Sequence, residues 1–111
     1  MRRGEVWWVN SDSSLGGEIR KRCPAVIVSN DAFNTYSNRL QVVPLTSNIE
    51  RVYPSEALIT LNGRPGKAMA DQLTTVSKGR LGGKAGQLTG KEMDKIDHVI
   101  RVQLGLAGPS R

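Results

Sequence analysis

Residues 89–104, TGKEMDKIDHVIRVQL, decide the fold class, because only here do the apolar residues follow a clear helical period. Thr89, followed three residues later by Glu92, forms a capping box that starts a helix. Gly105 ends it, as glycine often does at a helix C-terminus. One apolar stripe is expected along this helix, at Met93, Ile96, Val99, Ile100 and Leu104. The sequence therefore predicts one long C-terminal helix.

The chain before this helix consists of short apolar runs separated by turn residues. Predicted strands cover residues 4–10, 24–29, 40–45 and 57–61, and Asn62-Gly63 is a hairpin signal. Residues 30–34 predict a turn, with one helical turn within it as the alternative. Residues 67–76 predict a further strand or a kinked pair. The glycine-rich segment 79–86 predicts irregular structure, with a short strand near residues 85–88.

Strands this short, in a chain of 111 residues, usually curl into a half-open barrel with the helix on one face. The predicted class is α+β, mostly β. A single domain spanning residues 1–111 is expected, with a mobile loop at 11–22 and a disordered tail at about 107–111.

Composition limits the functions open to this chain. One cysteine, Cys23, excludes an internal disulfide and a cysteine-cluster zinc site, and one histidine, His98, excludes most histidine-based metal sites. A formal net charge of +6 favours a polyanionic partner, either nucleic acid or an acidic protein. The first apolar segment, residues 6–9, is too short for a secretory signal, and no run approaches a membrane span. Cytoplasmic residence and no membrane contact are therefore expected.

Two polar groups are candidates for contacts to phosphate. Glu18 lies among Arg20, Lys21 and Arg22 in the loop at 11–22, where an acid among bases can bind a phosphate; a solvated charge run is the alternative.

The second group follows the strand at 40–45, where Thr46, Ser47 and Asn48 offer two hydroxyls and an amide. Such groups can donate hydrogen bonds to phosphate oxygens. A simple strand-ending turn is the alternative interpretation.

Aromatic and amide side chains are candidates for base contacts. Trp7, Trp8 and Tyr53 could stack on bases. Alternation along a strand sends Trp7 and Trp8 to opposite faces, so one is expected in the core and the other half-exposed. Gln72, after Asp71 at a strand end, could contact a base edge or a backbone group. His98 is expected on the surface of the helix.

Taken in order, six segments of this chain resemble the MazF/PemK family of toxin endoribonucleases. They are RGEVWWV at 3–9, GGEIRK at 16–21, PAVIVSND at 24–31, VPLTSN at 43–48, ADQ at 70–72 and GL at 105–106. Each is short, but their order is specific, and the resemblance spans roughly residues 2–106.

The resemblance implies a small SH3-like β-barrel with a C-terminal helix, assembled as a homodimer. Members of the family cut single-stranded RNA (mRNA) at short sequences without metal or cofactor, leaving a 2′,3′-cyclic phosphate and a 5′-hydroxyl. A cognate antitoxin with an acidic disordered tail is the implied protein partner. The positive charge of this chain suits both acidic ligands.

Carried over residue by residue, the family pattern gives Thr46 a hydroxyl contact to the scissile phosphate. Glu18 would orient the catalytic groups or contact the RNA, and Gln72 resembles a base-contacting position. The basic residues at 20–22, with Ser47, Asn48 and Tyr53, complete the expected RNA-binding set. The family's catalytic arginine should stand directly before Pro24, and this chain has Cys23 there.

Three accounts of Cys23 are open. A strand that begins only at Pro24 would let Arg22 reach into the site, although neighbouring strand residues point to opposite faces. A selected or engineered loss of toxicity is the second account. The third is a redox-sensitive thiol beside Lys21 and Arg22. Apart from these accounts, the default interpretation of Cys23 is a small buried apolar residue.

The expected function is therefore a metal-independent endoribonuclease whose activity is weakened or abolished at position 23. A guanidinium gives a phosphate a permanent charge and a fork of donors, and a thiol gives neither. A non-catalytic RNA-binding or antitoxin-binding module on the same fold is the alternative, and a poison of DNA gyrase ranks below both.

Overall fold

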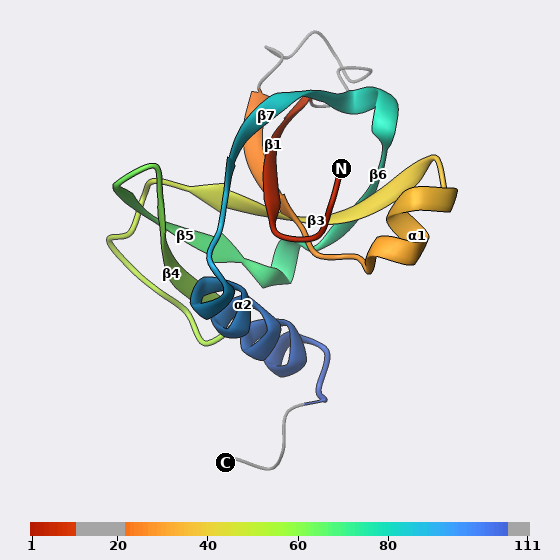
Figure 1. The fold of residues 1–111 in the computed structure, drawn as a ribbon. Coiled ribbons are helices and arrows are strands. Elements are labelled where there is room, and N and C mark those ends of the chain that lie inside the picture. The colour runs from red at the N-terminus through yellow and green to blue at the C-terminus, as the bar shows by residue number, and fades with distance from the viewer. Residues whose placement is uncertain (11–21, 107–111) are drawn as a thin grey trace, which may run out of the picture.

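The computed structural model describes residues 1–10 and 22–106, and their elements alternate short strands with two helices and two 3₁₀ turns. In order they are β1 (Glu5–Asn10), β2 (Arg22–Ile27), α1 (Asp31–Tyr36), β3 (Arg39–Thr46), β4 (Glu56–Leu61), β5 (Arg64–Met69), η1 (Ala70–Gln72), β6 (Thr74–Ser77), η2 (Lys78–Arg80), β7 (Leu81–Gln87) and α2 (Gly90–Gln103). Figure 1 shows the strands bending round one another, with α2 lying across one side.

The sheet is antiparallel throughout the described residues, and β3 is the strand that joins its parts. The strand order is β4-β5-β3-β2-β1-β7, and β6 also pairs with β3. The first half of β3 pairs with β6, its middle with β2, and its last two residues with β5. This architecture confirms the prediction of a mostly β half-barrel with a C-terminal helix.

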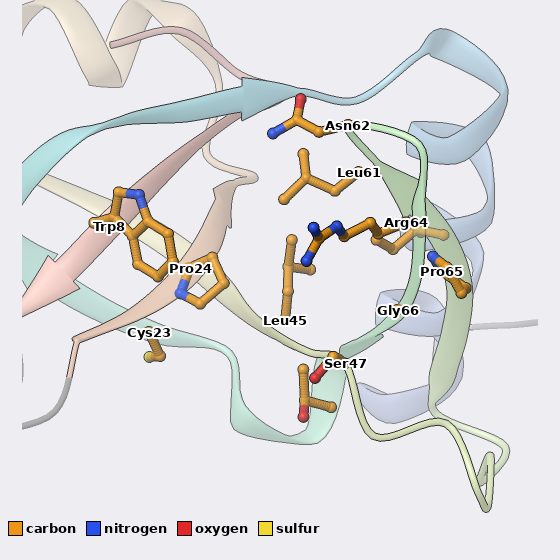
Figure 2. A pocket seen from close by; sticks show the side chains of 12 residues that line it. Trp8, Cys23, Pro24, Leu45, Ser47, Leu61, Asn62, Arg64, Pro65 and Gly66 are labelled. Carbon is orange, nitrogen blue, oxygen red and sulfur yellow. The ribbon is translucent and has the colours of Figure 1, made fainter.

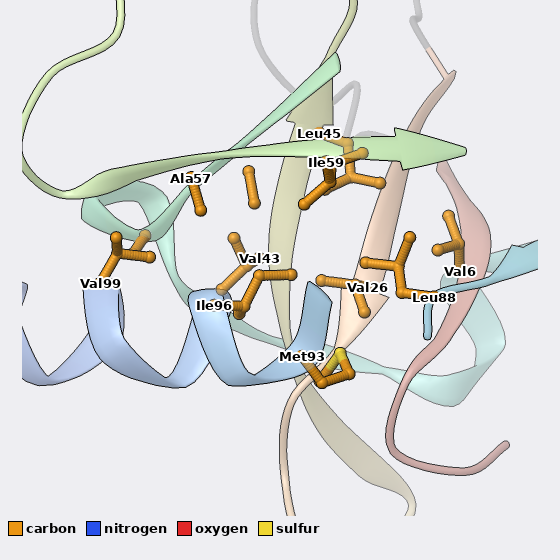
Figure 3. Close-up of a cluster of buried hydrophobic side chains, with 12 residues drawn as sticks. Val6, Val26, Val43, Leu45, Ala57, Ile59, Leu88, Met93, Ile96 and Val99 are labelled. Carbon is orange, nitrogen blue, oxygen red and sulfur yellow. The ribbon is translucent and has the colours of Figure 1, made fainter. Parts of the chain in front are cut away.

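Strands β2 and β3 bury side chains on both faces, so the sheet has a core on each side. The helix-side core consists of Val6, Val26, Val43, Leu45, Ala57, Ile59, Ala68, Ala70, Leu88, Met93, Ile96 and Val99. The second core consists of Val9, Ala25, Ile27, Leu40, Val42 and Val76. Figure 3 shows Met93, Ile96 and Val99 of α2 turned toward the strands.

Helix α2 has the start predicted from sequence. The hydroxyl of Thr89 accepts a hydrogen bond from the Glu92 amide, and the Glu92 carboxylate accepts one from the Thr89 amide. The same carboxylate accepts a third hydrogen bond, at 2.6 Å, from the amide of Thr60 on β4. Leu104 departs from the predicted apolar stripe, because it caps the helix end and is 58% exposed. No helix among the described residues has the length and apolarity that crossing a bilayer requires.

Strand β2 begins earlier than predicted, at Arg22 rather than Pro24, and ends at Ile27. Its pairing with β3 starts only at Ala25, so Pro24 faces a strand on one side only, where a missing amide donor is tolerated. The prediction of a mobile loop at 11–22 is thus wrong for Arg22. The remaining part of that prediction, residues 11–21, and the predicted tail at 107–111 lie outside the described residues.

The glycine-rich segment at 79–86 is mostly a strand, contrary to the irregular structure predicted. It contains β7, which pairs with β1 along its length with two register shifts. A Cβ at position 86 would lie 2.7 Å from the Leu61 side chain, so Gly86 allows close packing at this point. Residues 67–76 form the kinked pair rather than one strand, and Asp71-Gln72 lies in η1 between β5 and β6.

The β4–β5 hairpin turns at Asn62-Gly63, as predicted. Asn62 has φ +53° and Gly63 has φ +80°, which are the positive values that a tight two-residue hairpin turn requires. The Asn62 side-chain amide donates a 2.9 Å hydrogen bond to the carbonyl of Ala85 on β7. The tip of the hairpin is therefore held against β7, and Arg64 follows directly after it.

Candidate functional site

A cavity of about 560 Å³ opens on the sheet, and α2 contributes none of the described residues that line it. Side chains from β1 to β5 line it, and Figure 2 shows them converging on one space. The lining residues of this site cavity are Trp8, Cys23, Pro24, Leu45, Thr46, Ser47, Ile59, Leu61, Asn62, Arg64, Pro65 and Gly66. The described part of its wall is mainly apolar, with a few polar groups and one charged side chain, which is the usual character of a ligand-binding site.

Thr46 and Cys23 reach this cavity together because of the β2–β3 register. Ala25 pairs with Pro44, and the two strands are antiparallel, so Cys23 and Thr46 leave the ladder at the same end. Thr46 is half-buried, and its hydroxyl oxygen accepts a 3.2 Å hydrogen bond from the amide of Asn48. That bond uses a lone pair and leaves the hydroxyl proton free to donate. Two residues that sequence analysis singled out are therefore neighbours in one site.

Cys23 is exposed, so the default prediction of a small buried residue is wrong. It lies opposite Val9 on β1, and β2 here extends beyond its pairing with β3. Within the described residues, Cys23 is one of the side chains that line the site cavity.

The two adjacent tryptophans point to opposite faces, as predicted from strand alternation. Trp7 packs against the second core, and its indole nitrogen donates a 2.9 Å hydrogen bond to Glu5. Trp8 lines the site cavity, and the guanidinium of Arg22 lies 4.8 Å from the centre of its ring. Both indoles are half-buried. Arg22 therefore already covers one face of the ring that was expected to stack on bases.

A second depression, of about 420 Å³, adjoins the site cavity across the ladder pair of Thr46 and Lys67. Asn48, Glu50, Arg51, Tyr53 and Lys67 line it. The structure thus separates the predicted set, placing Thr46 and Ser47 in one hollow and Asn48 and Tyr53 in the next. Tyr53 is 51% exposed, and the Lys67 ammonium lies 5.7 Å from its ring centre.

Lys67 is a buried cation with fixed partners. Its ammonium donates to Glu56 at 2.8 Å and to the carbonyl of Arg51 at 2.5 Å. The hydrogen bond from Lys67, with another from the amide of Tyr53, lowers the pKa of the Glu56 carboxyl below its ordinary value of 4.5. This pair holds the loop before β4 against β5, so Lys67 has a structural role already.

The remaining predicted residues are not brought into these hollows. Gln72 is exposed on η1, its amide nitrogen lies 3.6 Å from the sulfur of Met69, and it lines neither depression. Glu18, Arg20 and Lys21 lie outside the described residues. His98 is exposed on α2, as expected. Among residues 1–10 and 22–106, no three acidic, histidine or cysteine side chains gather where they could hold a metal ion.

Sequence analysis missed the contribution of the β4–β5 hairpin, which supplies Leu61, Asn62, Arg64 and Pro65 to the cavity. The signal was present in the turn at Asn62-Gly63. A tight turn fixes the register, so Leu61 pairs with Arg64, and alternation then gives the face of every residue on β5. The sequence does not show with which end of the sheet this hairpin pairs.

Comparisons with known proteins agree on the family. A family model described as a PemK-like, MazF-like toxin of type II toxin-antitoxin systems matches residues 2–104. Endoribonuclease MazF9 of Mycobacterium tuberculosis is 38% identical over 115 residues, covering 96% of this chain and 98% of that protein. The endoribonuclease toxin MazF of Escherichia coli is 30% identical over 103 residues, covering 92% of each.

Solved structures give the same answer for the fold. A mycobacterial endoribonuclease in complex with its cognate antitoxin matches with a TM-score of 0.81 at 30% identity, covering 98% of this chain and 99% of that one. A MazE–MazF complex from Deinococcus radiodurans matches with a TM-score of 0.80 at 24% identity, covering 96% and 97%. On the family model and the two curated relatives, this chain belongs to the PemK-like, MazF-like toxins of type II toxin–antitoxin systems.

Proposed function

We propose that this protein is a toxin that cuts single-stranded RNA, chiefly mRNA, by a metal-independent route. The observation that carries the proposal is that Thr46 and Cys23, which both lie beyond the same end of the β2–β3 ladder, line one cavity. These are the positions at which the family pattern calls for phosphate-binding groups. The relatives of highest listed identity that cover most of this chain bear the name endoribonuclease.

In this reaction the ribose 2′-oxygen attacks the adjacent phosphorus. A bond from the 2′-oxygen to phosphorus forms, and the bond from phosphorus to the 5′-oxygen of the next nucleotide breaks. The 2′-hydroxyl loses its proton, and the departing 5′-oxygen gains one. The products are a 2′,3′-cyclic phosphate and a 5′-hydroxyl.

Negative charge grows on the phosphate oxygens as the 2′-oxygen attacks. The free hydroxyl proton of Thr46 can donate to one of them, and Ser47 offers a second hydroxyl on the same wall. Glu18 is proposed to orient the reacting groups or contact the RNA. Tyr53, Asn48 and Gln72 are proposed to contact the flanking nucleotides, together with the basic residues at 20–22.

Under this proposal, Cys23 lowers the rate of RNA cleavage below that of family members that have arginine at this position. Loss of one preorganised donor to a charge that develops in the transition state typically costs on the order of 10²–10³ in rate. The small thiol of cysteine has neither the permanent charge of a guanidinium nor its fork of N–H donors.

The same surface is proposed to bind a cognate antitoxin through an acidic segment, and the chain is proposed to act as a homodimer in the cytoplasm, where mRNA is found. The net charge of +6 supports an acidic partner. A related mycobacterial endoribonuclease has been solved with its antitoxin bound.

The test is cleavage of an unstructured RNA pool in EDTA by the natural protein and by Cys23→Arg, with Cys23→Ser as the matched control. Slow cutting by the natural protein and by Cys23→Ser, with a gain on the order of 10² in Cys23→Arg, is expected. The ends of the products should carry the cyclic phosphate and the 5′-hydroxyl.

Two results would change the proposal. Fast cutting by the natural protein would show that Cys23 does not impair catalysis. If Cys23→Arg also leaves RNA intact while remaining folded, the nuclease function fails. The second candidate, a non-catalytic module that binds RNA or antitoxin, is then favoured by the exposed thiol at the arginine position.

A further inference from the structure

We propose that Arg64, on β5, supplies the cationic contact to the RNA phosphate in the site cavity. The inference rests on the proposed function and adds to it a residue that no family motif in this sequence identifies. Among the described residues that line the cavity, Arg64 is the one that carries a charge. Arg64 is exposed, so its guanidinium is accessible and can offer a phosphate oxygen a permanent charge and a fork of donors.

The register of the β4–β5 hairpin puts Arg64 on the cavity face of the sheet. Along β5, Gly66 and Ala68 are buried and pair with Ile59 and Ala57, both in the helix-side core. Arg64 continues the same alternation one step beyond them, opposite Leu61. It therefore stands where the covered core ends and the open cavity begins.

The side chain is directed into this space. In Figure 2 the Arg64 side chain extends from its strand between Leu61 and Leu45 toward the middle of the cavity. Thr46 and Cys23 line the same cavity from β3 and β2. Within residues 1–10 and 22–106, Arg64 forms no ion pair with a carboxylate, so its charge is not neutralised by the part of the chain that is described.

The strand that carries Arg64 is held in place by two contacts. At Gly66, a Cβ would lie 2.9 Å from the carbonyl oxygen of Thr46, so glycine allows β5 to approach the end of β3 this closely. At the tip, the Asn62 side chain is hydrogen-bonded to Ala85 on β7. Arg64 lies between these two anchors. The backbone that presents the guanidinium is thus fixed relative to Thr46 before any ligand binds.

Arg22 is another described cation near the site, and its geometry is less suitable. It belongs to β2, where it pairs with Asn10, so it is not free to swing as a loop residue would be. Its guanidinium lies over the Trp8 ring, and Arg22 is not among the residues that line the cavity. An arginine at the mouth can attract RNA, but the cavity itself holds Arg64.

The experiment compares Arg64→Ala and Arg64→Lys with Arg39→Ala, a matched control that removes an exposed arginine from the opposite end of β3. The binding probe is a fluorescein-labelled pool of random RNA octamers with 2′-O-methyl riboses, which cannot be cut. Affinity is measured by anisotropy at several salt concentrations. Cleavage is measured with the unmodified pool, and folding by the urea midpoint.

Arg64→Ala should weaken binding roughly tenfold and make the salt dependence of log affinity shallower by about 0.7, as expected for one lost phosphate contact on a single strand. Cleavage should fall on the order of 10². Arg64→Lys should keep the salt slope and recover part of the rate, since it keeps the charge without the fork. Arg39→Ala should change the salt slope by less than half as much as Arg64→Ala does, both measured against the natural protein.

A second comparison separates a phosphate contact from a general effect on the fold. In a Cys23→Arg background a guanidinium is already present, so Arg64→Ala should cost less cleavage than in the natural protein. An equal cost in both backgrounds would overturn the inference.

The binding and cleavage results distinguish failure of this inference from failure of the proposed function. If the natural protein cuts RNA and Arg64→Ala cuts and binds equally well, the inference fails and the proposed function stands. If the natural protein and Cys23→Arg never cut, the nuclease function fails, and the salt slope of binding still decides whether Arg64 contacts phosphate. If no RNA is bound at all, both proposals fall.

Discussion

The helix-side core and the site cavity lie on the same face of the same strands, yet one is sealed and the other is open. Leu45 and Ile59 belong to both. On one side of them, Val43 and Ala57 pack against α2 and are buried. On the other side the strands run past the end of α2, so the same alternation delivers Leu61 and Arg64 to an open hollow.

The strand pattern is the same in both regions. Coverage by α2 therefore decides which residues of this face stabilise the fold and which are available to bind a ligand. Where the helix covers the face, each apolar side chain removed should cost free energy of unfolding. Where it does not, polar and charged residues occupy the same positions of the alternation at little cost in stability. Variants in the two regions should therefore affect different measurements.

The largest effect on the covered side is expected from Ile96→Ala. Ile96 is fully buried between α2 and the strands, and truncation of such a side chain lowers the free energy of unfolding by about 2–5 kcal/mol. Urea unfolding at pH 7 measures this. RNA affinity below the unfolding midpoint should remain that of the natural protein. The control, Lys95→Ala, changes a neighbouring exposed position of α2 and should be near neutral. A fall in affinity for folded Ile96→Ala would show that the two regions are not separate.

The next effect belongs to the open side. Thr46→Val keeps the shape of the side chain and removes the hydroxyl that is proposed to donate to the phosphate. Cleavage should fall on the order of 10², about 2.7 kcal/mol in the barrier, whereas the urea midpoint should change little because Thr46 is only half-buried. Thr46→Ser restores the hydroxyl and should recover most of the rate. Equal cleavage by Thr46→Val and the natural protein would show that the Thr46 hydroxyl does not take part in the reaction.

In both regions, the features that were predictable from sequence are those that local rules determine. The period of α2, its capping box and the hairpin turn at Asn62-Gly63 all depend on local rules, and each stands in the structure. Local rules failed where a partner strand decides. Gly82, Gly83 and Gly86 look like breakers in sequence, but pairing with β1 makes them part of β7. Pro24 looks like a strand start in sequence. However, Val9 and Asn10 of β1 pair with Cys23 and Arg22, so β2 begins two residues earlier.

The site was predictable only in part, because it is assembled by tertiary contacts. Thr46 and position 23 came from motifs, and the register places them together. Arg64 belongs to no motif, and its place in the cavity depends on β5 pairing with the end of β3. Gln72 was favoured because it follows an apolar run, but that run ends in a 3₁₀ turn that carries it away from both hollows.

A smaller effect is expected at the ion pair between Glu56 and Lys67, which lines neither the helix-side core nor the site cavity. The folded state lowers the pKa of Glu56 below 4.5, chiefly through the hydrogen bond from Lys67. The unfolded chain thus takes up the proton first. This contribution to stability is complete above about pH 4.5 and is lost as pH falls through the lowered pKa of the folded state.

Glu56→Gln removes that titration while keeping an acceptor of similar shape. Urea midpoints from about pH 3 to 7 should fall less steeply with acid in Glu56→Gln than in the natural protein. Glu5 and Glu92 also have lowered pKa values, so some acid loss remains in both. Parallel curves for the two proteins would mean that the pair contributes nothing to acid sensitivity.

The smallest effect should come from the start of α2, at the boundary of the covered side. Thr89→Ala removes the side-chain acceptor for the Glu92 amide and should cost about 1 kcal/mol in the free energy of unfolding. Thr89→Ser keeps the acceptor and should stay close to the natural protein. Because Glu92 also accepts from Thr60 on β4, the helix start is tied to the sheet by a second route, so the site cavity should not change. If Thr89→Ala altered the salt slope of RNA binding, α2 would have to act on the cavity through β4, and the proposed separation of the two regions would be wrong.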